Sequence, residues 1–244
     1  MSRTSALGRL GNQIIRNLAC HFIAKKFDLN TTYSSKELIE QLGIDLFSGN
    51  CIYTSHKNVN DNNYFQIYNS SSLESNIITN SYFQTREITH FIYNYLHTDE
   101  IKSKIIEKNP YKERYNKNND LYIHIRLTDA KPNNPSIHYY LNTIKKVNFD
   151  NMYISTDEKT HDIVKTILQL YPNAKLIEYN EINTFQFAST CKHIILSHGS
   201  FSAVIGYLSF YSTIYYQEYE KDKIWYGDMF SINNWIKCDI PSSV

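Results

Sequence analysis

The second half of the chain alternates apolar and polar blocks that predict strands and helices in turn. Strands are expected at 121–127, 151–155, 174–179, 193–197 and 213–218. Helices are expected at 136–146, around 163–168, and at 184–191, 200–211 and 231–238. Repeated β-α units of this size predict a parallel sheet with helices on both faces. The expected fold class is therefore α/β.

The first half shows a weaker pattern of the same kind. A short strand at 5–7 precedes a glycine turn at 8–13, and apolar residues then recur at helical spacing from Ile14 to Ile23. Short strands are expected at 50–53 and 64–68, and a helix at 85–108 with a break at 98–99. The polar stretch at 116–120 predicts a linker. We therefore expect domains at 1–116 and 117–230, followed by a helix and tail at 231–244.

Composition narrows the class of protein. The 244 residues are 42% hydrophobic and 14% aromatic, which is typical of a globular protein rather than a disordered one. With a net charge of +1, the chain has no overall excess of positive charge that would bind nucleic acid or an anionic membrane. The four cysteines form no CxxC pair, which argues against a zinc knuckle or a redox motif. With no run of about 18 apolar residues and no signal-peptide core, we expect a cytoplasmic protein without a transmembrane segment.

The strand at 121–127 carries charge where a covered parallel strand should be apolar. Alternation puts Leu121 and Leu127 on one face, and His124 and Arg126 on the other. An arginine at a strand end needs an anionic partner, because its unpaired burial would be very costly. A bound phosphate or carboxylate and an internal salt bridge are both open at this point.

Two glycine turns lead from strands into helices. The segment 197–202 would open a helix with the amides of Ser200, Phe201 and Ser202, a place that favours an anion, although an ordinary serine cap explains the same residues. The turn at 8–13 lacks the third glycine of the dinucleotide fingerprint and the lysine of a P-loop. Ser155 and Glu158 have the spacing of a capping box, so Asp157 either complements a helix N-terminus or holds a base or sugar at the same sheet edge.

Four segments, in this order, resemble the α-1,2-fucosyltransferases of glycosyltransferase family 11. Gly8-Arg9-Leu10-Gly11-Asn12-Gln13 resembles that family's opening, and Ser81-Tyr82-Phe83-Gln84 its G-Y-F-Q segment. The run 121–129 resembles the H-x-R-R-x-D motif shared with α-1,6- and protein O-fucosyltransferases, and 191–202 the C-K-H…S-x-F-S segment. Two departures stand out. Leu127 replaces the second arginine, and Ala203-Val204 replaces a Trp-Trp pair.

The resemblance implies a GT-B-like enzyme, with two Rossmann-like halves whose parallel sheets face a cleft. It implies GDP-fucose as donor, inversion at the anomeric carbon, a terminal galactoside as acceptor and no metal or other cofactor. Arg126 would hold the diphosphate with Ser200, Phe201 and Ser202. The guanosine would contact His124 and Asp157.

The resemblance also assigns residues of the N-terminal half, and it leaves the catalytic base unidentified. Gly11 and Asn12 would face the cleft, within a loop that includes Arg9 and Gln13. Asp129 and His198 are candidates for the base that deprotonates the acceptor. Arg9 or Arg16 would compensate for Leu127, whose alternation predicts a place in the core.

Three other functions remain open from the sequence. Another nucleotide-sugar or acceptor would fit the two departures. A non-catalytic nucleotide- or glycan-binding descendant would fit a lost activity. A phosphate-ester hydrolase with His124 as nucleophile would need a second activating histidine, and the sequence shows no such set.

Overall fold

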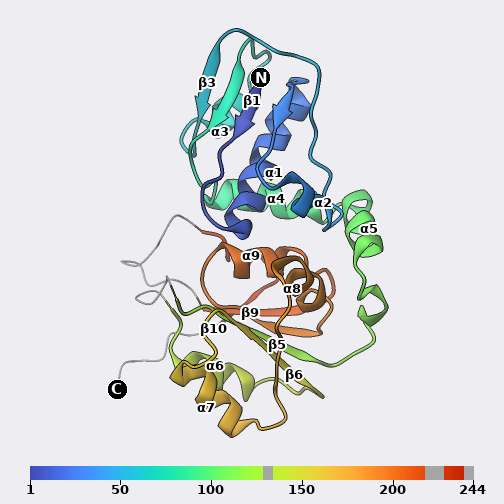
Figure 1. Cartoon of the computed structure of the whole chain (residues 1–244), viewed down its shortest axis with the longest axis vertical. Coiled ribbons are helices and arrows are strands. Elements are labelled where there is room, and N and C mark those ends of the chain that lie inside the picture. Colours follow the sequence, from blue (N-terminus) through green and yellow to red (C-terminus); the bar gives the residue numbers. More distant parts are fainter. Residues whose placement is uncertain (129–133, 218–227, 239–244) are drawn as a thin grey trace. The chain divides into compact units, whose positions relative to one another are not determined.

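A computed structural model describes residues 1–128, 134–217 and 228–238 (Figure 1). The chain forms two compact units, which divide between Lys108 and Asn109. Unit 1 is residues 1–108, with 228–229 grouped to it, and unit 2 comprises the rest of the described chain. Each unit is built around a parallel sheet, which confirms the α/β class. A cleft between the sheets stays a prediction.

Unit 1 holds a four-stranded parallel sheet in the order β2-β1-β4-β3. Its strands are β1 (Ser2–Thr4), β2 (Thr31–Thr32), β3 (His56–Val59) and β4 (Asn76–Thr79). Its helices are α1 (Leu10–Lys26), α2 (Lys36–Glu40), α3 (Tyr64–Tyr68), α4 (Arg86–Leu96) and α5 (Asp99–Lys108). The helical prediction for 85–108 is confirmed, including its break. Thr85 caps α4 by accepting a hydrogen bond from the Ile88 amide.

Three expectations for unit 1 are corrected. The first strand is 2–4 rather than 5–7, and residues 5–7 are exposed loop. The segment 64–68 is a helix, because a short apolar run fits a buried helix as well as a strand. Within it the Tyr64 hydroxyl donates to the Ala19 carbonyl at 2.9 Å. At 50–53, Cys51 forms only an isolated bridge to Leu29, and the strand lies later, at the polar sequence 56–59.

Arg16 is the buried charge of unit 1. Its side chain is 0% exposed. Its guanidinium donates to the carbonyls of Ser5 (2.7 Å), Ser81 (2.8 Å), Leu7 (3.3 Å) and Thr79 (3.3 Å), and to the Ser5 hydroxyl (2.9 Å). Burial lowers the pKa of Arg16, although an arginine stays protonated in proteins. Arg16 therefore holds the loops that follow β1 and β4, and it is occupied by main chain rather than presented to a ligand.

Unit 2 holds a six-stranded parallel sheet in the order β10-β9-β8-β5-β6-β7. Its strands are β5 (Leu121–Ile125), β6 (Met152–Thr156), β7 (Lys175–Leu176), β8 (His193–Ile195), β9 (Thr213–Gln217) and β10 (Ile236–Cys238). Its helices are η1 (Lys112–Arg114), α6 (Ile137–Ile144), α7 (Asp162–Leu170), α8 (Glu181–Ala188) and α9 (Ser200–Tyr207). In Figure 1, α6 and α7 cover one face of this sheet, and α8 and α9 the other.

The expected β-α series of unit 2 is confirmed except at its end. Residues 231–238 were expected to be helical, but β10 pairs in parallel with β9. The Trp235 ring lies where a side chain on Gly206 would stand, so the residue before β10 packs against α9. Leu127 is 1% exposed in the cluster with Leu121 and Tyr139, which confirms its predicted place in the core.

The polar stretch at 116–120 is fixed within unit 2. Arg114 pairs with Asp120 at 2.7 Å and lies 4.6 Å from the Phe187 ring. Asn118 donates to the carbonyls of Arg114 and Thr190. These contacts tie the entry of β5 to the end of α8. In a separate finding, no helix of the described chain is long and apolar enough to cross a membrane.

We expect Arg16→Met to destabilise the protein by at least about 3 kcal/mol, since each buried acceptor left unsatisfied costs about 1–3 kcal/mol. Arg16→Lys should recover only part of this loss, because an ammonium cannot reach all these carbonyls. Urea unfolding measures both variants against Arg86→Gln, a control at an exposed arginine. Wild-type stability in Arg16→Met would contradict the structural role.

Candidate functional site

The candidate site lies where β5 ends, between two neighbouring strands. β5 pairs with β6 on one side and β8 on the other, so the loops after all three strands meet at one sheet edge. His124 lies opposite Ser155 of β6, which confirms that the strands leading to Arg126 and Asp157 are neighbours. In open α/β sheets, ligands bind outside this carboxyl edge.

His124 is held on the helix-covered face that carries α9. It is 8% exposed, and its Nδ1 lies 2.5 Å from the Ser202 hydroxyl. Its ring lies 5.2 Å from Phe201, which stacks on Phe185 at 4.2 Å. Burial, more than the nearby charge of Arg126, lowers the pKa of His124 to about 4. The ring is therefore neutral at pH 7, with one nitrogen fixed by α9.

Arg126 follows β5 directly and lies against the backbone of Gly199. A Cβ added to Gly199 would stand 2.4 Å from Arg126 Nη1. Gly199 has φ +94° and ψ 164°, a conformation essentially restricted to glycine. The Arg126 amide donates to the Ser197 hydroxyl oxygen at 3.2 Å, and the Tyr140 hydroxyl donates to the same oxygen at 3.1 Å. The half-buried guanidinium is thus seated at the start of α9.

Asp157 is not part of a helix cap. α7 begins at Asp162, and the cap residue is His161, whose Nδ1 accepts from the Ile163 amide at 3.2 Å. Asp157 instead accepts from the Leu127 amide at 2.7 Å, and from the Thr128 hydroxyl at 2.6 Å and amide at 3.4 Å. The capping-box reading is therefore wrong, and Asp157 ties the exit of β5 to the exit of β6.

The electrostatics of Asp157 reflect these contacts. Burial acts to raise the pKa of Asp157, but the hydrogen bonds from the Thr128 hydroxyl and from the amides of Leu127 and Thr128 lower it below its ordinary value. The carboxylate is thus ionised at neutral pH. It adds negative charge to the edge where Arg126 adds positive charge.

The serine segment is brought to the same edge. Ser200, Phe201 and Ser202 form the first turn of α9, where amides have no partner within the helix. His198 Nε2 lies 3.1 Å from the Gln217 carbonyl, a geometry in which Nε2 donates and the ring is anchored to β9. Asp129, the other candidate base, lies outside the described residues.

The motif residues of unit 1 contact one another. Gly11, Asn12 and Gln13 lie in the first turn of α1, not in the turn before it. Asn12 accepts from the Gln84 amide at 2.7 Å, which joins the 8–13 and 81–84 segments. Gly8, with φ +78°, makes the sharp turn, and a Cβ there would collide with the Asn12 side chain. Gln13 donates to the Gly8 carbonyl at 2.9 Å. Arg9 directly precedes α1 as its N-cap.

Sequence reasoning missed the residues that support the site. Tyr140 anchors Ser197 from α6, and Phe185 supports Phe201 from α8. Both lie on helices that the apolar pattern identifies, but nothing local in the pattern shows which buried aromatic residue faces the strand ends. The role of Thr128, beside Asp157, was missed for the same reason.

Comparison with known proteins yields structural matches alone. No family model and no curated protein matches the chain. A structure of NodZ alpha-1,6-fucosyltransferase co-crystallized with GDP overlaps with a TM-score of 0.40 at 13% identity, over 63% of this chain and 58% of that one. One soaked with GDP-fucose gives 0.36 at 14%, over 57% and 53%. The chain spans less than two thirds of these proteins, and overlaps of this size indicate neither ligand nor reaction.

We expect Gly199→Ala to destabilise the protein by at least about 1–3 kcal/mol through backbone strain, with an added cost from the collision with Arg126. In an Arg126→Ala background the collision disappears and the strain remains. A double-mutant cycle measured by urea unfolding should therefore give a coupling of at least about 0.5 kcal/mol, modest because the end of a flexible side chain can move aside. Additive effects would show that the guanidinium does not press on Gly199 in solution.

Proposed function

We propose that the chain is a glycosyltransferase that moves fucose from GDP-fucose to a glycan hydroxyl. The observation that carries the proposal is the seat of Arg126 against Gly199, at the first turn of α9 and beside neutral His124. A guanidinium and helix-terminal amides that converge on one place form a site for an anion. The four motif segments that resemble fucosyltransferases supply the identity of the donor.

The chemistry of transfer fits such a site. As the bond from fucose to the diphosphate breaks, negative charge builds on the leaving GDP while the sugar becomes cationic. A fixed guanidinium placed at the diphosphate stabilises that charge most when it strengthens in the transition state. Arg126 takes this role, and the amides of Ser200, Phe201 and Ser202 add hydrogen bonds to the phosphates.

His124 and Asp157 face the guanosine in this proposal. Ser202 holds one nitrogen of His124, so the other nitrogen serves the nucleoside. The Asp157 carboxylate, which accepts from Leu127 and Thr128, lies at the end of the strand next to β5. Contact of Asp157 with the nucleoside would add to the hydrogen bonds that it accepts at the exit of β5.

The acceptor half of the proposal rests on the resemblance. Transfer to the 2-hydroxyl of a terminal galactoside, inversion at the anomeric carbon and independence of metal follow from the likeness to α-1,2-fucosyltransferases. His198 and Asp129 remain the candidates for the base. Because the carbonyls around Arg16 already occupy its guanidinium, Arg9 is the residue proposed to offset Leu127.

A second candidate is a non-catalytic protein that binds the same nucleotide. The buried Leu127, where the family has an arginine, is the observation that favours it. The two candidates differ in one assay. A transferase moves radiolabelled fucose from GDP-fucose to lactose in the presence of EDTA, whereas a binding protein is stabilised by GDP and transfers nothing. Transfer that EDTA abolishes and Mg²⁺ restores would contradict the arginine-based mechanism.

Arg126→Lys should reduce transfer at least about 100-fold, since a loss of about 3 kcal/mol is expected when the planar fork is replaced by a point charge. Arg114→Lys, which alters an arginine paired with Asp120, serves as control and should keep near-normal turnover in protein that remains folded. Near-normal transfer by Arg126→Lys would remove Arg126 from the mechanism.

Asp157→Ala should weaken GDP binding and also lower the free energy of unfolding by at least about 1.5–3 kcal/mol, because it removes hydrogen bonds from Leu127 and Thr128 to a charged group. Calorimetry measures the affinity and urea unfolding the stability. Glu158→Gln, at the next position, is the matched control. Unchanged GDP affinity with reduced stability would leave Asp157 a purely structural residue.

A further inference from the structure

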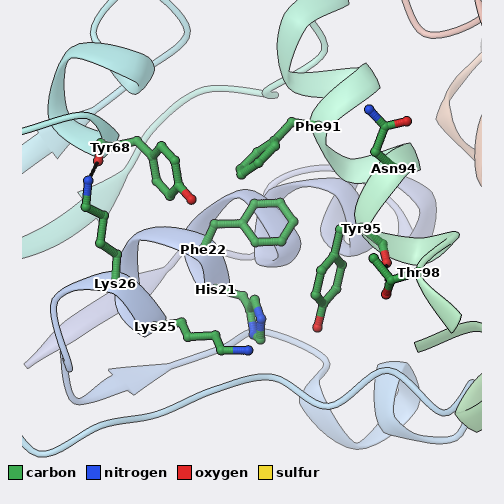
Figure 2. Close-up of a pocket in the computed structure, with 9 residues that line it drawn as sticks. All are labelled: His21, Phe22, Lys25, Lys26, Tyr68, Phe91, Asn94, Tyr95 and Thr98. Carbon is green, nitrogen blue, oxygen red and sulfur yellow. Dashed lines mark hydrogen bonds between the residues drawn. The ribbon is translucent and has the colours of Figure 1, made fainter. Parts of the chain in front are cut away.

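Unit 1 contains a cavity that the proposed function does not use. It has a volume of about 570 Å³, within the range of about 300–1,000 Å³ typical of small-molecule sites. Its walls come from the last two turns of α1, from α4 and from the end of α3 (Figure 2). The motif residue Asn12 stands at the other end of α1, roughly 20 Å from Lys25 at 1.5 Å per residue. The cavity is therefore separate from the motif cluster of unit 1.

The body of the cavity is aromatic. The Phe22 ring lies 4.5 Å from Phe91 and 4.9 Å from Tyr95, and Phe91 lies 5.1 Å from Tyr68. These rings meet in tilted and edge-to-face arrangements, and Figure 2 shows them side by side around the cavity. Aromatic pairs of this kind prefer a further ring in an offset or edge contact. An apolar ring is thus the group that this wall accepts.

The charged groups at the cavity are lysine ammonium groups, which only donate hydrogen bonds. Lys25 and Lys26 flank the rings in Figure 2, and none of the residues that line the cavity is acidic. Lys26 donates to the Tyr68 carbonyl at 2.5 Å, while Lys25 forms no ion pair with any residue in the described chain. The nearby carboxylate of Asp45 is paired with Lys104. The helix dipole places about half a negative charge at the C-terminal end of α1, which is less than the positive charge of the two lysines.

His21 adds a donor that lacks an acceptor. Its Nδ1 accepts from the Phe47 amide at 2.9 Å, so the neutral ring carries its hydrogen on Nε2. Nε2 is buried and has no partner among the described residues. Burial, reinforced by the charge of Lys25, lowers the pKa of His21 to about 4. A buried donor of this kind points to a missing acceptor.

We propose that this cavity binds a small aromatic carboxylate, with its ring against Phe22, Phe91 and Tyr95 and its carboxylate between Lys25 and His21. The ligand ring packs on the aromatic wall, and its carboxylate pairs with exposed Lys25. It also supplies the acceptor that His21 Nε2 lacks, once the side chains that close this nitrogen off from water move aside. This binding site does not depend on the fucosyltransferase proposal, because none of its residues belongs to the site proposed for the donor.

The test uses the full chain and the probe 3-phenylpropionate, with 3-phenylpropanamide as an uncharged analogue of the same shape. Calorimetry should give a dissociation constant of about 1 mM or tighter for the acid, as expected for a ligand of this size. The amide should bind at least about tenfold more weakly, because it loses the charge-assisted hydrogen bonds. The ¹⁵N resonance of His21 Nε2 should shift on addition of the acid.

Variants distinguish ligand binding from a role of the lysines in stabilising the C-terminal end of α1. Lys25→Gln should weaken the acid about tenfold, whereas Lys146→Gln, an equal charge change at an exposed site in unit 2, should not. Asn94→Trp, at an exposed position on the rim, should block the cavity and leave the melting temperature unchanged.

Three results would overturn the proposal. The first is no binding of the acid at about 10 mM, well above the expected dissociation constant. The second is equal affinity for acid and amide. The third is wild-type affinity in both Lys25→Gln and Asn94→Trp, which would place the acid elsewhere and leave the lysines as complements of the helix end. None of these outcomes bears on transfer from GDP-fucose, which the radiolabel assay measures separately.

Discussion

The backbone groups at the carboxyl ends of parallel strands need partners, and this constraint organises both units. Beyond the last ladder pair, amides and carbonyls turn toward loops, where burial without a hydrogen bond would be costly. In unit 1 the partner is Arg16, which donates to carbonyls after β1 and β4. In unit 2 the partners are Asp157 and Ser197, which accept from the amides after β5.

Some polar residues at the strand ends hold the backbone in place. Asp157 holds the amides of Leu127 and Thr128, and this fixes the direction in which the chain leaves β5. The direction sends Leu127 into the core and Arg126 to the opposite side, against Gly199. An arginine at position 127 would have to leave that core to reach a donor. In the proposed function, the exit of β5 thus presents one guanidinium to the donor.

Much of this fold could be predicted from periodicity. The β-α series of unit 2 and the pair α4 and α5 follow from long, regular patterns, which sequence reads best. The failures are local runs decided by tertiary contacts. The helix at 64–68 carries a hydrogen bond from Tyr64 to the Ala19 carbonyl, and the segment around Trp235 packs its ring on Gly206, so both depend on contacts far away in the sequence.

The residues of the candidate site could be predicted from the sequence, but their contacts could not. Alternation and the glycine turn identify His124, Arg126 and Gly199. The Ser202 contact to His124 spans most of unit 2 in sequence, and no local pattern encodes it. The capping-box spacing around Asp157 was misleading, because the helix begins only at Asp162 and the carboxylate is taken by loop amides.

Three arginines show why charge alone does not identify a functional residue. Arg16 is enclosed by carbonyls, and Arg114 is paired with Asp120 and covered by Phe187, so each has a structural reason to be charged. Arg126 differs in its position, because it stands just past a central strand, half-buried, where the facing backbone is a glycine with φ +94°. That backbone is strained for any other residue, and it leaves room for the guanidinium at the start of α9. In the proposed function, this arrangement is what positions the charge of Arg126 at the diphosphate.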